Sequence, residues 1–330
     1  MSVCITGMHR SGTSLVARLL NLCGVYLGDE RKMIAPNPDN PKGFWEYRPF
    51  AELNDKILKQ LDASWNYPPL VMTTGWNDSP EFSLLKAEAK QLVTTFAPYD
   101  LWGWKDPRTS LTLPFWQGLL PDLKVVICLR SPLEVAQSLK KREAGGIEPR
   151  DLVHYPYRLW QIYYDRLLAA CPAEKRILTH YESYFCDAPR ELQRLAEFLE
   201  IDIPAANIQA AVDFVSTQLY RQQSTVSDLI TSPVPLEALE AYLDLCQLAG
   251  PVYRQTRSYQ TWQEILPADP KQRRLALLET RAVYPKTILN EDSSSPFLQV
   301  FWANSGSGFD EAQSVKRTIN FFRKQAQTFL

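Results

Sequence analysis

The sequence predicts a three-layer α/β protein in which helices cover both faces of a central, mostly parallel sheet. Three observations favour this fold class. Residues 3–24 have the pattern of a short strand, a glycine-containing loop and a helix with one apolar side. Residues 124–129 form a nearly all-apolar, β-branched run that is typical of a central parallel strand. Strand-like and helix-like segments then alternate along most of the chain.

The other elements follow from hydrophobic periodicity and from the positions of proline and glycine. We expect strands at 3–6, 100–104, 124–129 and 176–180, and helices at about 13–24, 49–61, 80–96, 109–119, 133–142, 151–170, 188–200, 205–216 and 235–248. The proline-rich segment 29–44 cannot continue a helix. Long loops of this kind often form lids or substrate walls in compact domains.

Residues beyond about 255 differ in character from the rest. We expect residues 1–255 to form the main domain, residues 256–295 a helical linker, and residues 296–330 a small β-rich C-terminal tail. The tail has strand patterns at 297–302, 316–321 and 325–330. Because a few strands cannot form an independent sandwich, the tail either packs on the main domain or is part of a truncated second domain.

Composition excludes several classes of protein. With 45% hydrophobic and 22% charged residues, the chain is globular, and its net charge of −1 provides no global basic field for nucleic acid. The six scattered cysteines indicate free thiols in a reducing compartment. No signal-peptide pattern precedes the first strand and no apolar run has the length of a membrane span, so we expect a cytoplasmic protein.

The loop Gly7–Ser14 resembles the phosphate-binding pattern G-x-x-x-x-G-K-[ST], and it lies between a strand and a helix as that pattern requires. Thr13 stands where the pattern has lysine. Backbone N–H groups and the helix N-terminus still attract an anion, and Arg10 can supply positive charge. The missing lysine argues against an ATPase. A sulfuryl group carries less charge than a phosphoryl group, so Arg10, the backbone and the hydroxyls of Thr13 and Ser14 would suffice without a metal.

A second anion-binding group follows the strand at 124–129. Arg130 lies at the carboxyl end of that strand, where ligands collect in open α/β sheets. Ser138 and Arg142 lie eight and twelve positions later, on one face of the next helix. Arginine is well suited to bind a phosphate with two parallel hydrogen bonds. A charge that abuts a buried strand usually needs an anionic partner, so we expect Arg130 to bind one.

In chain order, these segments resemble the motifs of the sulfotransferase superfamily that uses 3′-phosphoadenylyl sulfate. Arg10-Ser11-Gly12-Thr13-Ser14 resembles its 5′-phosphosulfate loop, Arg130 to Ser138 its 3′-phosphate motif, Lys105-Asp106-Pro107 the K-D-P element of tyrosylprotein and carbohydrate sulfotransferases, and Tyr181-Glu182 its Y-E-x element. The resemblance implies a P-loop-like fold, a 3′-phosphoadenylyl sulfate donor, an adenosine 3′,5′-bisphosphate product and no metal. It implies donor contacts from Arg10, Ser11, Gly12, Thr13, Ser14, Arg130, Ser138 and Tyr181, and the shared helix face adds Arg142 to this set.

Transfer to a hydroxyl needs a base and a positive group at the leaving oxygen. The resemblance suggests Glu46 as the base, since it follows the proline-rich loop, and its apolar neighbours Phe44 and Trp45 suit that task. The alternative is that Glu46 is simply an acid at a helix N-terminus. His9 is a second candidate base, whereas His154 and His180 are expected to be structural.

Lys105 is the candidate for stabilising the leaving oxygen, with help from Arg10. Asp106 is expected to orient Lys105 or an acceptor hydroxyl, and Arg108 to serve the acceptor. Because aromatic faces stack on sugars, Trp45 and other tryptophans near the site favour a carbohydrate acceptor. Most of these rings are, individually, better explained as core.

Two other functions stay open. One is a P-loop kinase or NTPase with a variant loop; the other is a non-catalytic glycan-binding relative. A protein tyrosine, a lipid headgroup or a small metabolite remains an alternative acceptor to carbohydrate.

Overall fold

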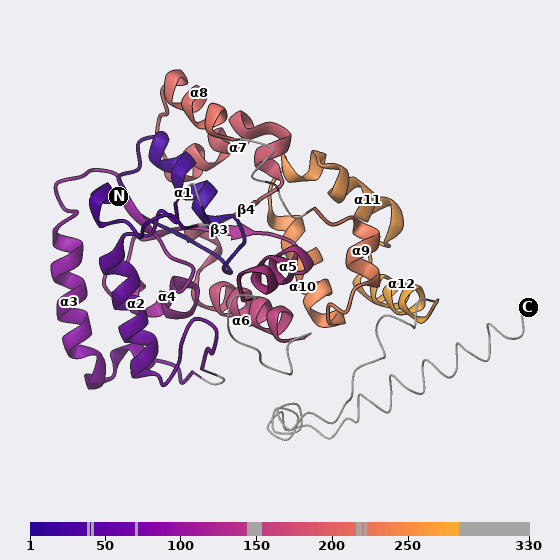
Figure 1. The fold of residues 1–330 in the computed structure, drawn as a ribbon, viewed down its shortest axis with the longest axis horizontal. Helices are drawn as coiled ribbons and strands as arrows, with labels where there is room; N and C mark the ends of the chain where they lie inside the picture. The colour runs from indigo at the N-terminus through magenta and orange to yellow at the C-terminus, as the bar shows by residue number, and fades with distance from the viewer. Residues whose placement is uncertain are drawn as a thin grey trace, which may run out of the picture.

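In the computed structural model (Figure 1), four parallel strands form a sheet in the order β2-β1-β3-β4. Their bounds are Ser2–Thr6 for β1, Trp102–Lys105 for β2, Lys124–Leu129 for β3 and Arg176–His180 for β4. The structure describes residues 1–37, 40, 43–69, 72–143, 154–215, 220 and 223–283. The fold class predicted from the sequence is confirmed, as are all four strands of the main domain.

Alternation along the strands divides the core between the two faces of the sheet. On β1, Val3 and Ile5 belong to one hydrophobic cluster and Cys4 to the other; on β3, Val126 and Val125 divide in the same way. A parallel sheet that is buried on both faces needs nearly continuous apolar strands. This requirement explains why the run at 124–129 is the clearest strand signal in the sequence.

Helices cover both faces (Figure 1). Their bounds are α1 Thr13–Leu22, α2 Arg48–Gln60, α3 Ser83–Thr94, α4 Thr109–Gln117, α5 Pro132–Glu143, α6 Tyr155–Ala170, α7 Ser183–Leu199, α8 Ala205–Phe214, α9 Val226–Thr231, α10 Leu236–Leu248, α11 Arg257–Ile265 and α12 Pro270–Val283. Helices α1, α7 and α8 bury residues against one face, whereas α2, α4, α5, α6 and α10 contribute to the cluster on the other. The sheet therefore lies between two helical layers.

The chain leaves β1 and β3 toward opposite faces. Helix α1, which follows β1, packs in one cluster through Leu15 and Val16, whereas α5, which follows β3, packs in the other through Leu133 and Val135. When the connections that follow two neighbouring parallel strands run to opposite faces of the sheet, a crevice forms at the carboxyl ends of those strands. Ligands bind in this crevice in open α/β sheets. The loop that follows β1 and the residues that follow β3 both lie at this crevice.

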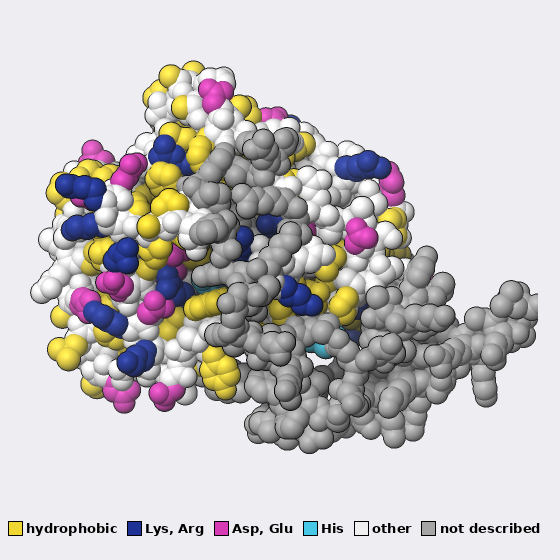
Figure 2. Space-filling view, viewed as in Figure 1, with side chains coloured by type: hydrophobic (Ala, Val, Ile, Leu, Met, Phe, Trp, Pro, Cys, Tyr) yellow, Lys and Arg dark blue, Asp and Glu magenta, His cyan; other side chains and the backbone are white. Residues whose placement is uncertain are grey.

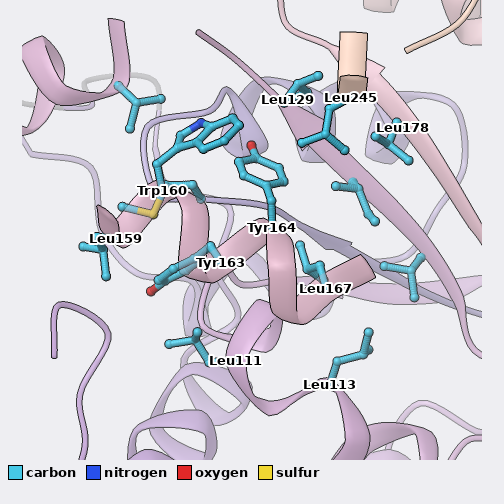
Figure 3. Packing of buried hydrophobic residues seen from close by; sticks show 14 of the residues in the cluster. Leu111, Leu113, Leu129, Leu159, Trp160, Tyr163, Tyr164, Leu167, Leu178 and Leu245 are labelled. Atoms are coloured by element: carbon cyan, nitrogen blue, oxygen red, sulfur yellow. The ribbon is translucent and has the colours of Figure 1, made fainter. Parts of the chain in front are cut away.

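Helix α6 packs against α4 and α5. In Figure 3 its aromatic side chains lie between Leu111 of α4 and Leu129 of β3. The indole N–H of Trp160 donates to the Arg130 carbonyl at 3.1 Å, and the Tyr164 hydroxyl donates to the Cys128 carbonyl at 2.7 Å. Buried hydroxyl and indole groups need such partners. These two hydrogen bonds fix the end of β3, where the crevice begins.

Helix α9 was not expected from the sequence, whereas α11 and α12 lie within the segment expected to be a helical linker. Beyond residue 255, Trp262 of α11 and Leu277 of α12 are buried in the same cluster as α9 and α10. The division at residue 255 stays a prediction. The strands expected at 297–302, 316–321 and 325–330 lie outside the described residues.

The six cysteines are free thiols, and all except the exposed Cys186 are buried. Within the described part of the chain, no helix combines the length and apolar character that crossing a membrane requires. In Figure 2, basic and acidic side chains are interspersed over the visible face. That mixture accords with the net charge of −1.

Candidate active site

The loop between β1 and α1 is shaped by two glycines. Gly7 has φ of +138°, and a Cβ there would lie 2.4 Å from the Cys128 carbonyl oxygen. Gly12 has φ of +86°, and a Cβ there would lie 2.2 Å from Cδ2 of Tyr181. Only glycine combines these backbone angles with such close approach. The loop is thus pressed against β3 on one side and against Tyr181 on the other.

The N-terminus of α1 has the features of an anion site. Its N-cap is Gly12, which offers no side-chain cap, and its first turn, fully described by the structure, carries no acidic residue. The first N–H groups of a helix need acceptors from outside the helix and lie at the positive end of its dipole. The sequence-predicted ligands Thr13 and Ser14 are the first two residues of this turn. Ser11, also predicted, is buried, with its Oγ 3.1 Å from the Tyr164 hydroxyl.

Arginine side chains join this loop to α5 and to the end of β3. The Nε of Arg10 donates to Oγ of Ser138 at 2.8 Å, and Nη1 of Arg130 donates to the Arg10 carbonyl at 3.3 Å. The Arg130 guanidinium lies over the Tyr181 ring, 4.5 Å from its centre. The structure therefore brings together four of the donor residues predicted from the sequence. The side chain of Arg142 lies outside the described residues.

Arg130 has a partner that the sequence reading missed. Its Nε donates to Oε2 of Glu134 at 2.7 Å, and both residues are buried, with 7% and 3% of their surface exposed. We expected an anionic partner for Arg130 and sought it only in a ligand. Glu134 lies in the first turn of α5, four positions after Arg130, and this i, i+4 spacing could have suggested it beforehand.

A second charged group lies at the end of β2. The Nζ of Lys105 contacts Oε1 of Glu46 at 2.6 Å, and the two residues are only 2% and 7% exposed. Lys105 pairs with Ile5 in the sheet, and the Thr6 hydroxyl donates to the Asp106 carbonyl at 2.9 Å. This group consequently lies beside the start of the loop Gly7–Ser14, which we call the anion loop. The proposed base and the proposed leaving-group cation, 59 residues apart, are in direct contact.

Arg108 extends this group. Its Nη2 lies 3.3 Å from Oε2 of Glu46, its Nη1 contacts Asp55 at 2.8 Å, and its Nε donates to Asp106 at 2.9 Å. Burial would by itself lower the pKa of Arg108, but the three carboxylates outweigh it and raise that pKa. Arg108 therefore stays charged and ties the Glu46 carboxylate to the end of β2.

Asp106 has a different partner from the one we expected. Its carboxylate accepts from the N–H and Nε of Arg108 and from Nδ2 of Asn54, with the amide contact at 2.8 Å. Lys105 is held by Glu46 instead. Burial raises the pKa of Asp106, and the adjacent Arg108 opposes that rise. Asn54, another residue that the sequence reading missed, also accepts from the Trp116 indole at 2.9 Å. Asp106 thus orients Arg108.

The segment that carries Glu46 is fastened to its surroundings. The N–H of Ile34 donates to the Glu46 carbonyl at 2.8 Å, which holds the two ends of the proline-rich loop together. Trp45 has φ of +57°, an uncommon angle for a residue with a side chain. Its ring lies 4.4 Å from the guanidinium carbon of Arg18 on α1. The contacts of the Glu46 carboxylate are ionic, rather than the apolar packing we expected.

The tryptophans divide between the core and the site. Trp102, Trp104 and Trp116 are buried in the cluster that packs around Phe50. Trp65 is different: its ring lies 4.6 Å from that of His9 in the anion loop. Most of the rings considered for acceptor stacking are thus core residues. His180 is also internal, since its Nε2 lies 3.0 Å from the hydroxyl of a buried tyrosine, Tyr242.

A glycine-containing loop after the first strand, faced by an arginine after a neighbouring strand, is the arrangement of P-loop-like α/β proteins. Thr13, in place of lysine, separates it from the NTPases of that class. The chain belongs to the sulfotransferase family, whose family model matches residues 2–205. It is therefore a sulfotransferase, and this membership decides against the kinase alternative.

Three solved structures are similar to the chain. Sulfotransferase STF9 from Mycobacterium avium is 15% identical with a TM-score of 0.45, over 74% of this chain and 76% of that one. Sulfotransferase STF1 from Mycobacterium tuberculosis is 16% identical with a TM-score of 0.41, over 67% and 73%. The sulfotransferase domain from the curacin biosynthetic pathway is 17% identical with a TM-score of 0.39, over 84% and 95%. No curated protein matches the chain. We rest the assignment on the family model alone.

Proposed function

We propose that this protein transfers a sulfuryl group from 3′-phosphoadenylyl sulfate to a hydroxyl of a carbohydrate acceptor, with Glu46 as the base and without a metal. The observation that carries the proposal is the buried contact between Lys105 and Glu46 at 2.6 Å, beside an anion loop that Arg10 joins to Ser138. A carboxylate and a cation held together at a strand end provide the two groups that transfer to a hydroxyl requires.

The residues present fit the donor. The uncapped N-terminus of α1 and Arg10 suit its sulfate end, and Arg130 with Ser138 suits a 3′-phosphate. Tyr181 lies between these two regions, against both Gly12 and Arg130. When bound, the donor supplies the sulfuryl group and becomes adenosine 3′,5′-bisphosphate as that group moves to the acceptor oxygen.

Glu46 accepts the acceptor's hydroxyl proton on a carboxylate oxygen. Its two cationic neighbours, Lys105 and Arg108, fix its orientation. Lys105 also lies beside the anion loop, where its ammonium group can meet the negative charge that develops on the leaving phosphate.

Carbohydrate is favoured by the aromatic groups near the loop. Trp65 packs beside His9, and Tyr67, two residues later, is 58% exposed. An exposed aromatic ring next to charged and hydrogen-bonding groups suits the alternating apolar and polar faces of a sugar. Arg108 and the half-exposed Asp55 offer polar contacts for acceptor hydroxyls.

A labelled-sulfate transfer assay over a panel of acceptors tests the proposal. We expect incorporation into saccharides, and we expect it to survive EDTA. Incorporation into peptides, lipids or small metabolites but not saccharides would refute the acceptor class. Activity lost to EDTA and restored by Mg²⁺ would refute the metal-free mechanism. Thermal stabilisation by adenosine 3′,5′-bisphosphate is the matching binding test, and its absence would contradict the donor assignment.

A further inference from the structure

Glu134 is a buried carboxylate that the proposed chemistry does not use. It lies in the first turn of α5, with 3% of its surface exposed. Its Oε2 accepts from Nε of Arg130 at 2.7 Å. A buried carboxylate is costly unless charged and hydrogen-bonded partners surround it, so its position calls for an explanation.

The other oxygen of Glu134 binds a segment far along the chain. Oε1 accepts from the N–H of Ser224 at 3.0 Å and from its hydroxyl at 3.3 Å. The Tyr220 hydroxyl makes a longer contact with the same oxygen, at 3.4 Å. Both residues lie in the connection between α8 and α9, about 90 positions after Glu134. One carboxylate therefore joins that connection to Arg130.

The Arg130 guanidinium is fixed from several directions at once. Besides Glu134, it reaches the Arg10 carbonyl at 3.3 Å and lies 4.5 Å above the Tyr181 ring. The Tyr220 ring lies 5.7 Å from its central carbon. Tyr220 thus contacts both members of the Arg130–Glu134 pair. Tyr220 and Ser224 consequently contribute to a wall of the proposed donor site.

We propose that Glu134 is a positioning residue for donor recognition: it holds the Arg130 guanidinium in the orientation that grips the 3′-phosphate and secures Tyr220 and Ser224 beside it. This inference rests on the proposed function, in which Arg130 binds the 3′-phosphate. An arginine side chain has much rotamer freedom, and holding it in place before binding removes an ordering cost from the ligand's affinity.

The Glu134 carboxylate also repels a phosphate, which opposes this effect. Positioning outweighs repulsion because three groups lose their common anchor when the carboxylate is removed: the guanidinium, the Ser224 backbone and the Tyr220 hydroxyl. Repulsion is a single interaction, and the positive charge of Arg130 lies between the carboxylate and the ligand and offsets it.

The test uses the full chain and isothermal titration with adenosine 3′,5′-bisphosphate and adenosine 5′-phosphate. For Glu134→Gln we expect the bisphosphate Kd to rise by about tenfold or more, and the monophosphate Kd to change by less than about twofold. Ser224→Ala should shift the bisphosphate Kd in the same direction by a smaller factor, because Ser224 keeps its backbone contact.

A matched control separates positioning from stability. Glu191 on α7 is fully buried, pairs with Arg194 at 2.6 Å and accepts from the Thr179 hydroxyl at 2.6 Å, and none of these residues is a proposed donor ligand. Glu191→Gln should lower the melting temperature as Glu134→Gln does, yet leave the ratio of the two Kd values unchanged.

Three results would overturn the inference. The first is an unchanged Kd ratio in Glu134→Gln, and the second is a control variant that alters the ratio equally. The third is tighter bisphosphate binding, which would show that the carboxylate mainly repels phosphate. If the wild-type protein binds both nucleotides with equal affinity, the proposed 3′-phosphate site itself is contradicted, and the inference that depends on it fails as well.

Discussion

Replacing Gly12 by alanine tests the packing of the anion loop most directly. The backbone at φ of +86° costs a residue with a Cβ about 1–2 kcal/mol. The new Cβ would also lie 2.2 Å from Cδ2 of Tyr181, far inside van der Waals contact. The Tyr181 ring cannot move away easily, because Arg130 lies 4.5 Å from its centre and the Phe185 ring 5.1 Å. Overpacking of this kind adds about 1–3 kcal/mol.

We therefore expect Gly12→Ala to lower the free energy of unfolding by about 2–5 kcal/mol. Gly24→Ala is the matched control, since Gly24 has φ of +106° but no atom within 4 Å of its built Cβ. That variant should lose only the backbone part, about 1–2 kcal/mol. Urea denaturation followed by tryptophan fluorescence measures both. Equal losses in the two variants would refute the role given to Tyr181.

Two further predictions concern acidic side chains. Glu46→Gln should reduce sulfuryl transfer by about 10²–10⁴-fold while the Kd for adenosine 3′,5′-bisphosphate stays nearly constant. A parallel loss of binding would show that Glu46 is structural. Burial raises the pKa of Glu182 from 4.5 to about 7; the Ser258 hydroxyl bond opposes that rise, and the charge of Glu134 adds to it. Since folding favours the protonated form, this stabilisation is complete below pH 4.5 and is lost as the pH rises through 7, by about 3 kcal/mol. Glu182→Gln should not titrate, so its stability advantage over wild type should grow between pH 5 and 7.5; a constant difference in urea denaturation contradicts this.

Much of the fold follows from local signals. The apolar run at 124–129 and the short strand before Gly7 identified the two central strands, because a sheet buried on both faces leaves little choice of residue. Helix α9 was missed because it is short, with six residues, and packing stabilises it more than its own sequence does. For α9 a signal existed: Thr225 and Asp228 form a capping box.

The positions of the site residues that directly follow strands could be predicted from the sequence. Arg10 and Arg130 follow neighbouring parallel strands, so their convergence could be inferred before the structure was known. The partners of Glu134 could not, because Tyr220 and Ser224 lie about 90 residues away and no local pattern links them. The orientation of Asp106 was misjudged, although aspartate commonly accepts from the N–H two residues later, here that of Arg108.

Ser14 connects the proposed donor site to the segment that carries Glu46. Its Oγ accepts from Nδ2 of Asn40 at 3.2 Å, and Asn40 also donates to the Gly43 carbonyl at 2.7 Å, three residues before Glu46. A hydroxyl can accept one hydrogen bond while it donates another. Through Asn40, Ser14 is thus connected to the segment that carries the proposed base. If a donor bound at Ser14 orders that segment for the acceptor, reciprocity requires that each ligand lower the other's Kd by the same factor.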